Sequence, residues 1–180
     1  MITSVLWNIS AFDPRITDIA GYAFYEAANL VSAELPSALQ SVGAYAFFGA
    51  KKLVSAPLSP SVTSIGNNAF SGCSSLAEAN LYEGLSTIGT GAFALCGALT
   101  DITLEDGFTS ISDLMFWSCE NLQKIDLPAS ITEIQSRAFD GCTKLKAIEF
   151  IGAAPTIADD AFKSVTAVIS YPGTDTSWDT

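Results

Sequence analysis

Four cysteines are the residues of this sequence with the most distinctive chemistry. They stand at positions 73, 96, 119 and 142, each 23 residues after the last. A set of four thiols can form disulfides or hold a metal ion. The positions at the same 23-residue spacing outside this run hold Ala27, Ala50 and Val165, which are small apolar residues. We therefore expect buried free cysteines acting as small apolar side chains, with a disulfide between neighbouring units as the alternative and no bound metal.

Histidine is absent from all 180 residues of the sequence. It is the usual general base near neutral pH and the commonest zinc ligand, so most hydrolase triads and zinc sites are excluded. We predict no enzymatic activity and no cofactor.

The charge balance limits the partners. Nineteen acidic residues stand against eight basic ones, which gives a formal net charge of −11, so phosphate backbones and anionic lipid surfaces are repelled. We find neither a run of apolar residues long enough to span a membrane nor a basic residue ahead of a long apolar run at the start. We predict no nucleic-acid partner, no membrane insertion and no signal peptide in this chain.

The 23-residue spacing extends over most of the sequence. Phenylalanine stands at 24, 47, 70, 93, 116, 139 and 162. Similar apolar residues open each unit at Ile16, Leu39, Val62, Leu85, Phe108 and Ile131. A fixed period of this size indicates stacked repeats. We number the units coil 1 to coil 6, covering 16–38, 39–61, 62–84, 85–107, 108–130 and 131–153.

Coil 3 shows the expected secondary structure of a unit. Its second half follows the pattern L-x-x-[A/I]-x-L, and alternating inward residues predict a strand over 76–81. A shorter extended stretch at 62–65 leads into a Gly-Asn-Asn corner, and one irregular or helical turn is expected around 69–73. We predict a mostly β leucine-rich-repeat solenoid of about seven stacked coils, with a parallel sheet on one face, short second strands, and irregular or single-turn segments elsewhere.

The repeat resembles that of the BspA-like leucine-rich-repeat family. The stretches V-T-S-I-G-N-N-A-F-S-G-C-S-S-L at 62–76 and I-T-E-I-Q-S-R-A-F-D-G-C-T-K-L at 131–145 carry nearly its whole signature. Met115 and Ser118 depart from it in coil 5, and Leu95 replaces a glycine in coil 4. The resemblance implies a secreted or cell-surface protein of a host-associated microbe, engaged in adhesion to host matrix proteins or other cells.

The chain divides into three parts. Residues 1–15 form an N-terminal half coil or cap, with Trp7 and Phe12 in register with the columns of Leu30 and Leu35. Residues 16–153 hold six repeats, and 154–180 form a degenerate last coil and a C-terminal cap. We expect Trp178 to cover the last open coil.

Polar residues that point outward from the predicted strands form the first candidate binding site, an acidic concave face. Its members are Glu34, Glu78, Asn80, Asp101, Asp126 and Glu149. Such a face can receive a basic partner segment or, with Glu105 and Asp106, bind Ca²⁺ weakly. The alternative is a solvated face that keeps the solenoid soluble. A glycosidase-like carboxylate pair is disfavoured because a flat open sheet gives no enclosing pocket.

Aromatic residues outside the core columns form the second candidate, an aromatic patch. Its members are Tyr22, Tyr25, Tyr45, Phe48 and Trp117. Large rigid side chains at a surface suit protein partners or sugar stacking. The alternative is packing of these rings against residues 1–15 or against further repeats.

The sequence as a whole indicates a non-enzymatic binding solenoid of an extracellular or cell-surface protein. Its expected partner is another protein, for example of the extracellular matrix or a second cell surface, or a glycan. A structural spacer within a longer surface protein and a carbohydrate-binding module are the alternatives. The ligand and the oligomeric state stay open.

Overall fold

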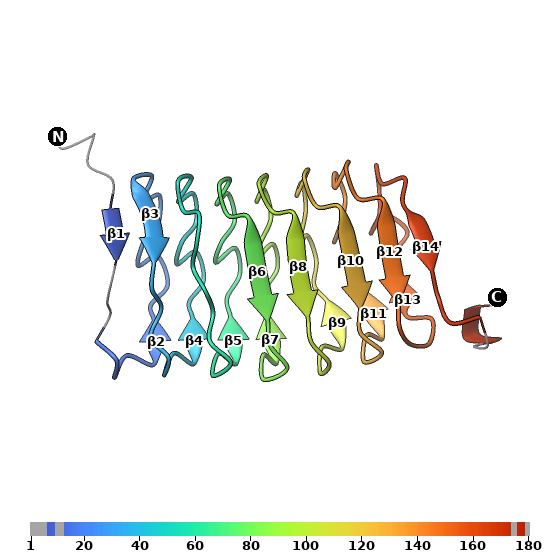
Figure 1. Ribbon diagram of the computed structural model, residues 1–180, viewed down its shortest axis with the longest axis horizontal. Helices are drawn as coiled ribbons and strands as arrows, with labels where there is room; N and C mark the ends of the chain where they lie inside the picture. The colour runs from blue at the N-terminus through green and yellow to red at the C-terminus, as the bar shows by residue number, and fades with distance from the viewer. Residues whose placement is uncertain (1–6, 10–12, 174–175, 179–180) are drawn as a thin grey trace.

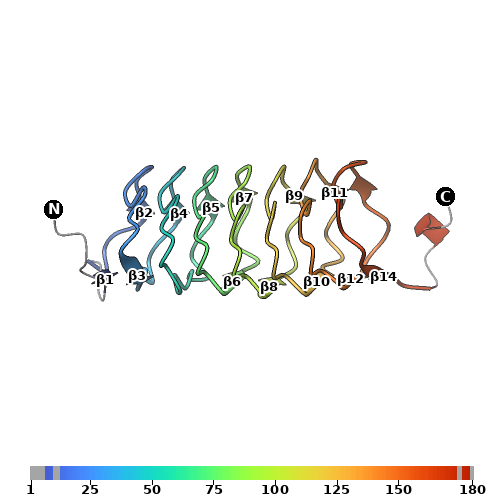
Figure 2. The same ribbon diagram turned by 90° about the horizontal axis from the view of Figure 1, so that it is seen from above.

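The chain winds into a row of stacked coils, as a computed structural model shows (Figures 1 and 2). It describes residues 7–9, 13–173 and 176–178. Each coil has a short strand on one side, and most have a longer strand on the other. In this part of the chain the helical content is one 3₁₀ turn, η1 (Thr176–Trp178), so no helix has the length or apolar content needed to cross a membrane. The predicted mostly β solenoid of about seven coils is confirmed.

The longer strands form one face of the row. They are β1 (Trp7–Ile9), β3 (Leu30–Ala33), β6 (Glu78–Leu81), β8 (Asp101–Leu104), β10 (Lys124–Leu127), β12 (Ala147–Phe150) and β14 (Val168–Ser170). Neighbours pair in parallel with the register of the repeat, so Glu78 lies opposite Asp101 and Asp126 lies opposite Glu149. The row is nearly straight (Figure 2), and this long-strand face is therefore open and flat rather than concave.

Two-residue strands line the other side, the short-strand face. They are β2 (Asp18–Ile19), β4 (Ser41–Val42), β5 (Ser64–Ile65), β7 (Thr87–Ile88), β9 (Ser110–Ile111), β11 (Glu133–Ile134) and β13 (Thr156–Ile157). They form two parallel sheets, β2-β4-β5-β7 and β9-β11-β13. The strands are shorter than the sequence pattern indicates, because the chain bends into the next corner after only two paired residues.

The seven phenylalanines of the 23-residue column form a continuous stack through the core. Successive ring centroids lie 5.0, 5.1, 5.4, 6.0, 5.4 and 5.1 Å apart from Phe24 to Phe162, with nearly parallel planes. The five inner rings are fully buried. Since each ring is covered by the rings of both neighbouring coils, one coil alone leaves its core open on two sides.

The segment after each short strand is a tight turn rather than a helix. In coils 1 to 6 two residues per turn have positive φ, for example Asn68 at 53° and Gly72 at 73° in coil 3. A left-handed residue ends any right-handed helical run. The turns of successive coils instead bond to one another, as when Phe47 N–H donates to Ala69 O at 2.7 Å.

Both ends of the row carry chain in register with the repeats. β1 pairs with β3, with Trp7 opposite Leu30, whereas Phe12 lies outside the described residues. At the other end the Trp178 ring packs edge-on against Phe150 at 4.7 Å and stacks on Tyr171 at 4.8 Å. Its indole N–H donates to Gly152 O at 3.3 Å. Trp178 therefore covers part of the last coil, as expected from the sequence.

The long-strand sheet is not continuous, contrary to the simplest expectation from the repeat. In coil 2 the strand is reduced to a single bridge between Ser32 and Ser55. Pro57 stands in this segment and has no N–H to donate to a ladder. Between coils 4 and 5 the ladder is interrupted on both faces, because β8 does not pair with β10 and β7 does not pair with β9. The ladders are thus interrupted at coil 2 on one face and between coils 4 and 5 on both, where the turns still bond, as Phe93 N–H does to Met115 O at 3.0 Å.

Candidate functional site

The cysteine column is buried between the coils. Each thiol lies in the core and donates to a backbone carbonyl of the preceding coil, as Cys73 does to Phe47 O at 3.2 Å and Cys142 to Phe116 O at 3.1 Å. Burial raises the pKa of Cys73 and of Cys142 to about 12, and it raises the pKa of Cys96 and Cys119 well above 9.0. All four are free thiols. The expected structural burial is confirmed, and neutral, enclosed thiols are poor nucleophiles.

Four of the five residues expected in the aromatic patch come together on coils 1 and 2. Tyr22 stacks on Tyr45 at 5.1 Å and Tyr25 stacks on Phe48 at 5.2 Å. The two stacks meet at tilted angles, with Tyr22 to Tyr25 at 5.6 Å and Tyr45 to Phe48 at 5.7 Å. We call these four residues the aromatic quartet. Tyr22 is 60% exposed and Tyr25 44%, so the quartet presents ring faces and edges to solvent.

The backbone beneath the quartet is in an unfavourable conformation for tyrosine. Tyr22 has φ 61° and Tyr45 has φ 58°. The same position holds Asn68 and Gly91 in coils 3 and 4, the residue types that tolerate this region best, and Leu114 and Arg137 in coils 5 and 6, all with positive φ. For other L-residues the left-handed region costs about 1–2 kcal/mol each. The two tyrosines therefore occupy positions where the turn itself favours asparagine or glycine.

Trp117, expected in the same patch, lies apart from the quartet. It shares a column with Tyr25 and Phe48, but Ser71 and Ala94, which are both buried, stand between them in coils 3 and 4. The guanidinium of Arg137 lies over the Trp117 ring at 5.5 Å. Arg137 also forms an ion pair with Asp140 at 3.0 Å. A neighbouring coil thus covers Trp117 in part, and the ring is only partly exposed.

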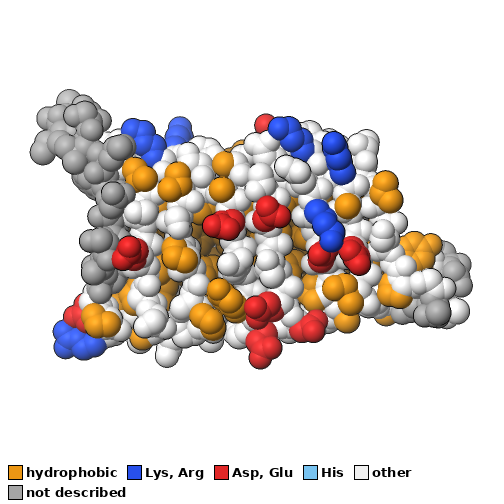
Figure 3. All heavy atoms as spheres, viewed as in Figure 1, with side chains coloured by type: hydrophobic (Ala, Val, Ile, Leu, Met, Phe, Trp, Pro, Cys, Tyr) orange, Lys and Arg blue, Asp and Glu red, His pale blue; other side chains and the backbone are white. Residues whose placement is uncertain are grey.

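The acidic residues expected on one face lie exposed on the long-strand face but do not form a continuous stripe (Figure 3). Glu78 and Asp101 face each other across β6 and β8. Lys124 forms ion pairs with Asp126 at 2.9 Å and with Glu149 at 3.3 Å. Hydrogen bonds to Asp126 and then to Glu149 raise the pKa of Lys124. The charges of Asp126 and Glu149 are therefore partly neutralised. Glu78 and Asp101 form the acidic centre of the face.

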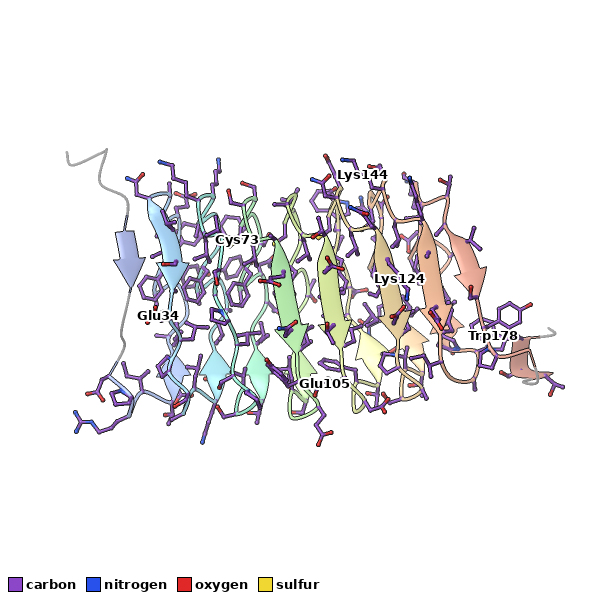
Figure 4. All side chains as sticks on the ribbon, viewed as in Figure 1. Glu34, Cys73, Glu105, Lys124, Lys144 and Trp178 are labelled. Carbon is purple, nitrogen blue, oxygen red and sulfur yellow. The ribbon has the colours of Figure 1, made fainter. Side chains whose placement is uncertain are left out.

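The remaining members of the acidic set do not add a metal site. Glu34 lies at the far end of the face from Lys124 (Figure 4), and Asn80 pairs with Thr103 on β8. The carboxylate of Glu105 accepts the N–H of Glu83 at 3.2 Å. Within the described ranges, no three His, Cys, Asp or Glu residues gather in a group that could hold a metal ion.

A hollow on the short-strand face was missed by the sequence analysis. It lies between β7 and β9, has a volume of about 390 Å³ and is lined mainly by Ser, Thr and other uncharged polar residues. The signal for it was present in coil 5, where Phe108, Ser112 and Met115 replace the smaller Leu85, Gly89 and Ala92 of coil 4. Met115 was noted only as a departure from the repeat pattern, and the buried Phe108 and Met115 give coil 5 a larger core than coil 4 has at these positions.

The sequence and the coordinates were compared with known proteins. The sequence model described as "BspA type Leucine rich repeat region" matches residues 5–123 and 78–172, with six copies. The search of curated proteins found no match.

Several solved structures share the fold. The leucine-rich cell surface protein of Faecalibacterium prausnitzii is 22% identical, with TM-score 0.54 over 91% of this chain and 65% of that one. A leucine-rich repeat protein of Eubacterium ventriosum is also 22% identical, with TM-score 0.67 over 80% and 45%. The pneumococcal vaccine antigen PcpA gives 22% identity and TM-score 0.54 over 80% and 34%. The chain thus spans less than two thirds of the length of these proteins.

Proposed function

Because this chain belongs to the BspA-type leucine-rich repeat family, we propose that it is a non-enzymatic solenoid of an extracellular or cell-surface protein that binds another protein. The proposal draws on the names of the similar structures, which include a cell surface protein and a vaccine antigen. It also draws on the open architecture, in which most outward positions are free to vary while the inward columns are fixed.

The observation that carries the proposal is the aromatic quartet. Tyr22 and Tyr45 together cost the fold about 2–4 kcal/mol through their left-handed backbone. The ring contacts that they make contribute about 0.5–1.5 kcal/mol each, so the two tyrosines bring the fold little net stability. Exposed aromatic rings are the residues that most often dominate protein interfaces.

Basic residues stand beside the quartet. Lys51 and Lys52 are exposed in the same turn of coil 2 as Phe48, with the exposed Glu26 next to Tyr25, in a protein of net charge −11. Aromatic anchors beside basic residues fit a partner surface with an apolar centre and an acidic rim. A partner of that charge is disfavoured on the long-strand face, where Glu78 and Asp101 stand together.

The test is a comparison of two double variants of the whole chain. Tyr22→Asn/Tyr45→Asn places at both positions the residue that coil 3 has there, and Glu78→Gln/Asp101→Asn is the control on another face. Binding is measured against immobilised extracellular-matrix proteins and against cultured epithelial cells. We expect the tyrosine variant to bind at least about tenfold more weakly, a loss of about 1.4 kcal/mol, and the control to bind like the wild type.

Two outcomes contradict the proposal. Equal binding by the tyrosine variant and the wild type removes the quartet from recognition. No binding of the wild type to any protein or cell surface in the panel favours a structural spacer within a longer surface protein.

A further inference from the structure

The short-strand face has one junction at which the coil-to-coil hydrogen bonds are missing. In coil 4, Thr87 N–H donates to Thr63 O and Gly89 N–H donates to Ile65 O. In coil 6, Glu133 and Gln135 donate in the same way to Thr109 and Ile111. The equivalent backbone bonds from Ser110 and Ser112 of coil 5 to Ser86 and Ile88 are absent among these described residues, and the Ser112 hydroxyl instead donates to Gly89 O at 3.1 Å. Two backbone N–H groups and two carbonyls are therefore left without a backbone partner at this junction.

The side chains of coil 5 explain why the gap stays open. At Gly66 and Gly89 an added Cβ would lie 2.4 Å from a backbone nitrogen of the preceding coil. Coil 5 has Ser112 at this position, but coil 6 has Gln135 there and its N–H still donates to Ile111 O at 3.0 Å, so the serine alone does not open the gap. The larger Phe108 and Met115 are both buried beneath it, and the Phe93 and Phe116 rings are 6.0 Å apart, the widest spacing of the stack.

The resulting hollow has an apolar floor and polar walls. Its volume is about 390 Å³, within the range of small-molecule sites. Ile88, Leu85 and Phe108 form part of its lining, and Ile88 is half-buried here although Ile65 and Ile111 are fully buried. Thr87, Thr109 and Ser110 line the walls, and none of the lining residues is charged. The Ser110 hydroxyl donates to Glu133 Oε2 at 3.3 Å.

We propose that this hollow, the coil 4–5 slot, binds a neutral saccharide. A pyranose ring has an apolar C–H face that suits the partly exposed side chain of Ile88 in the floor. Its hydroxyl groups both donate and accept, and so match the unpaired N–H groups of Ser110 and Ser112 and the carbonyls of Ser86 and Ile88. Charged ligands find no counter-charge among the lining residues. The slot shares no residue with the aromatic quartet, so this proposal does not depend on the proposed protein partner.

The test uses the intact chain and a panel of neutral sugars: glucose, galactose, mannose, N-acetylglucosamine and the β-1,4-linked disaccharides of glucose and of N-acetylglucosamine. Binding is followed by NMR shifts of backbone amides, together with hydrogen exchange of the Ser110 and Ser112 amides. We expect saturable shifts for at least one sugar, confined to residues of the slot, and slower exchange of these two amides in its presence.

Two variants make the result specific. The first, Phe108→Leu/Ser112→Gly/Met115→Ala, gives coil 5 the residues that coil 4 has at the same positions. In this variant we expect β7 to pair with β9, the amide at position 110 to exchange more slowly without sugar, and sugar binding to be lost. Thr87→Val/Thr109→Val removes two hydroxyl groups with little change of shape and is expected to weaken binding at least about tenfold while leaving the unfolding midpoint unchanged. This second variant keeps the test valid if the triple variant fails to fold.

The proposal is overturned by the absence of saturable shifts for every sugar in the panel up to 20 mM. Shifts that lie outside the slot, or that persist unchanged in Thr87→Val/Thr109→Val, also overturn it.

Discussion

The cysteine column shows how the stack sets the chemistry of single residues. Each thiol is enclosed by neighbouring coils and bonded to a carbonyl, and burial raises the pKa of Cys73 to about 12. The folded state therefore holds these protons at pH values where an unfolded chain, with thiol pKa near about 8.5, has released them. Proton release on unfolding makes the stability of the protein depend on pH.

We predict a loss of stability between about pH 9 and about pH 12 that the cysteines cause. The folded pKa lies above the unfolded one, so the stabilisation is complete below the unfolded pKa and is lost as the pH rises towards the folded pKa. Each thiol lowers the free energy of unfolding by about 1.4 kcal/mol per pH unit in this window. Urea unfolding at several pH values measures the slope.

The matched control is the variant with alanine at all four cysteine positions, the residue that coils 1 and 2 have in this column at Ala27 and Ala50. Its stability at neutral pH is expected to be lower, since volume is lost from the core, but its alkaline slope should be shallower. An unchanged slope in the alanine variant contradicts the burial of these thiols.

Single residues also mark the limit of what the sequence predicts. The column positions identified the buried phenylalanines and cysteines, because an inward position has the same neighbours in every coil. They did not predict that Lys124 would bind Asp126 and Glu149, or that Arg137 would lie over Trp117. Those contacts depend on the direction of long exposed side chains, which the repeat does not constrain.

Among the elements, the strand of coil 2 is the one that departs from its neighbours. Coils 1, 3 and 4 have four-residue strands β3, β6 and β8, whereas coil 2 has only the bridge from Ser32 to Ser55. The long-strand face is hollowed where Pro57 and Asn80 line a small pocket. Coil 4 has Thr103 where coil 2 has Pro57, and proline removes one ladder donor.

We predict that Pro57→Thr extends the coil 2 strand and joins β3 to β6. The new hydrogen bond contributes about 1 kcal/mol, and the greater freedom of the unfolded chain offsets about 0.4–1 kcal/mol of it, so the net stability should change little. Hydrogen exchange is the appropriate measurement: amides of residues 53–58 should become more protected, while those of β10 serve as the internal control. Unaltered protection at 53–58 means that proline is not what interrupts the ladder.

The same elements show where a repeat pattern stops being informative. Period and alternation predicted the parallel long strands and their register, since those follow from spacing alone. The break between β7 and β9 could not be read from the period, which is unbroken at 23 residues. We attribute it to the volumes of the buried Phe108 and Met115, and the effect of volume on coil spacing becomes visible only when the stack is built.

At the scale of the whole molecule, stability resides in contacts between neighbouring coils. The phenylalanine stack runs from Phe24 to Phe162 without interruption, and the turns bond from coil to coil along it. The aromatic quartet lies outside this core, on coils 1 and 2, with Tyr22 60% exposed. A solenoid of this kind tolerates change at outward positions as long as the inward columns are kept.

The midpoint of thermal unfolding of Tyr22→Asn/Tyr45→Asn tests most directly whether the quartet serves recognition rather than folding. Asparagine has a lower conformational cost than tyrosine at these left-handed positions, and this gain is expected to offset the lost ring stacking. The variant should therefore unfold at the same temperature as the wild type or at a higher one. For a chain of this size, 1 kcal/mol corresponds to about 2–4 °C. A midpoint lower by more than about 4 °C would show that the rings hold the first two coils together, and would contradict the account.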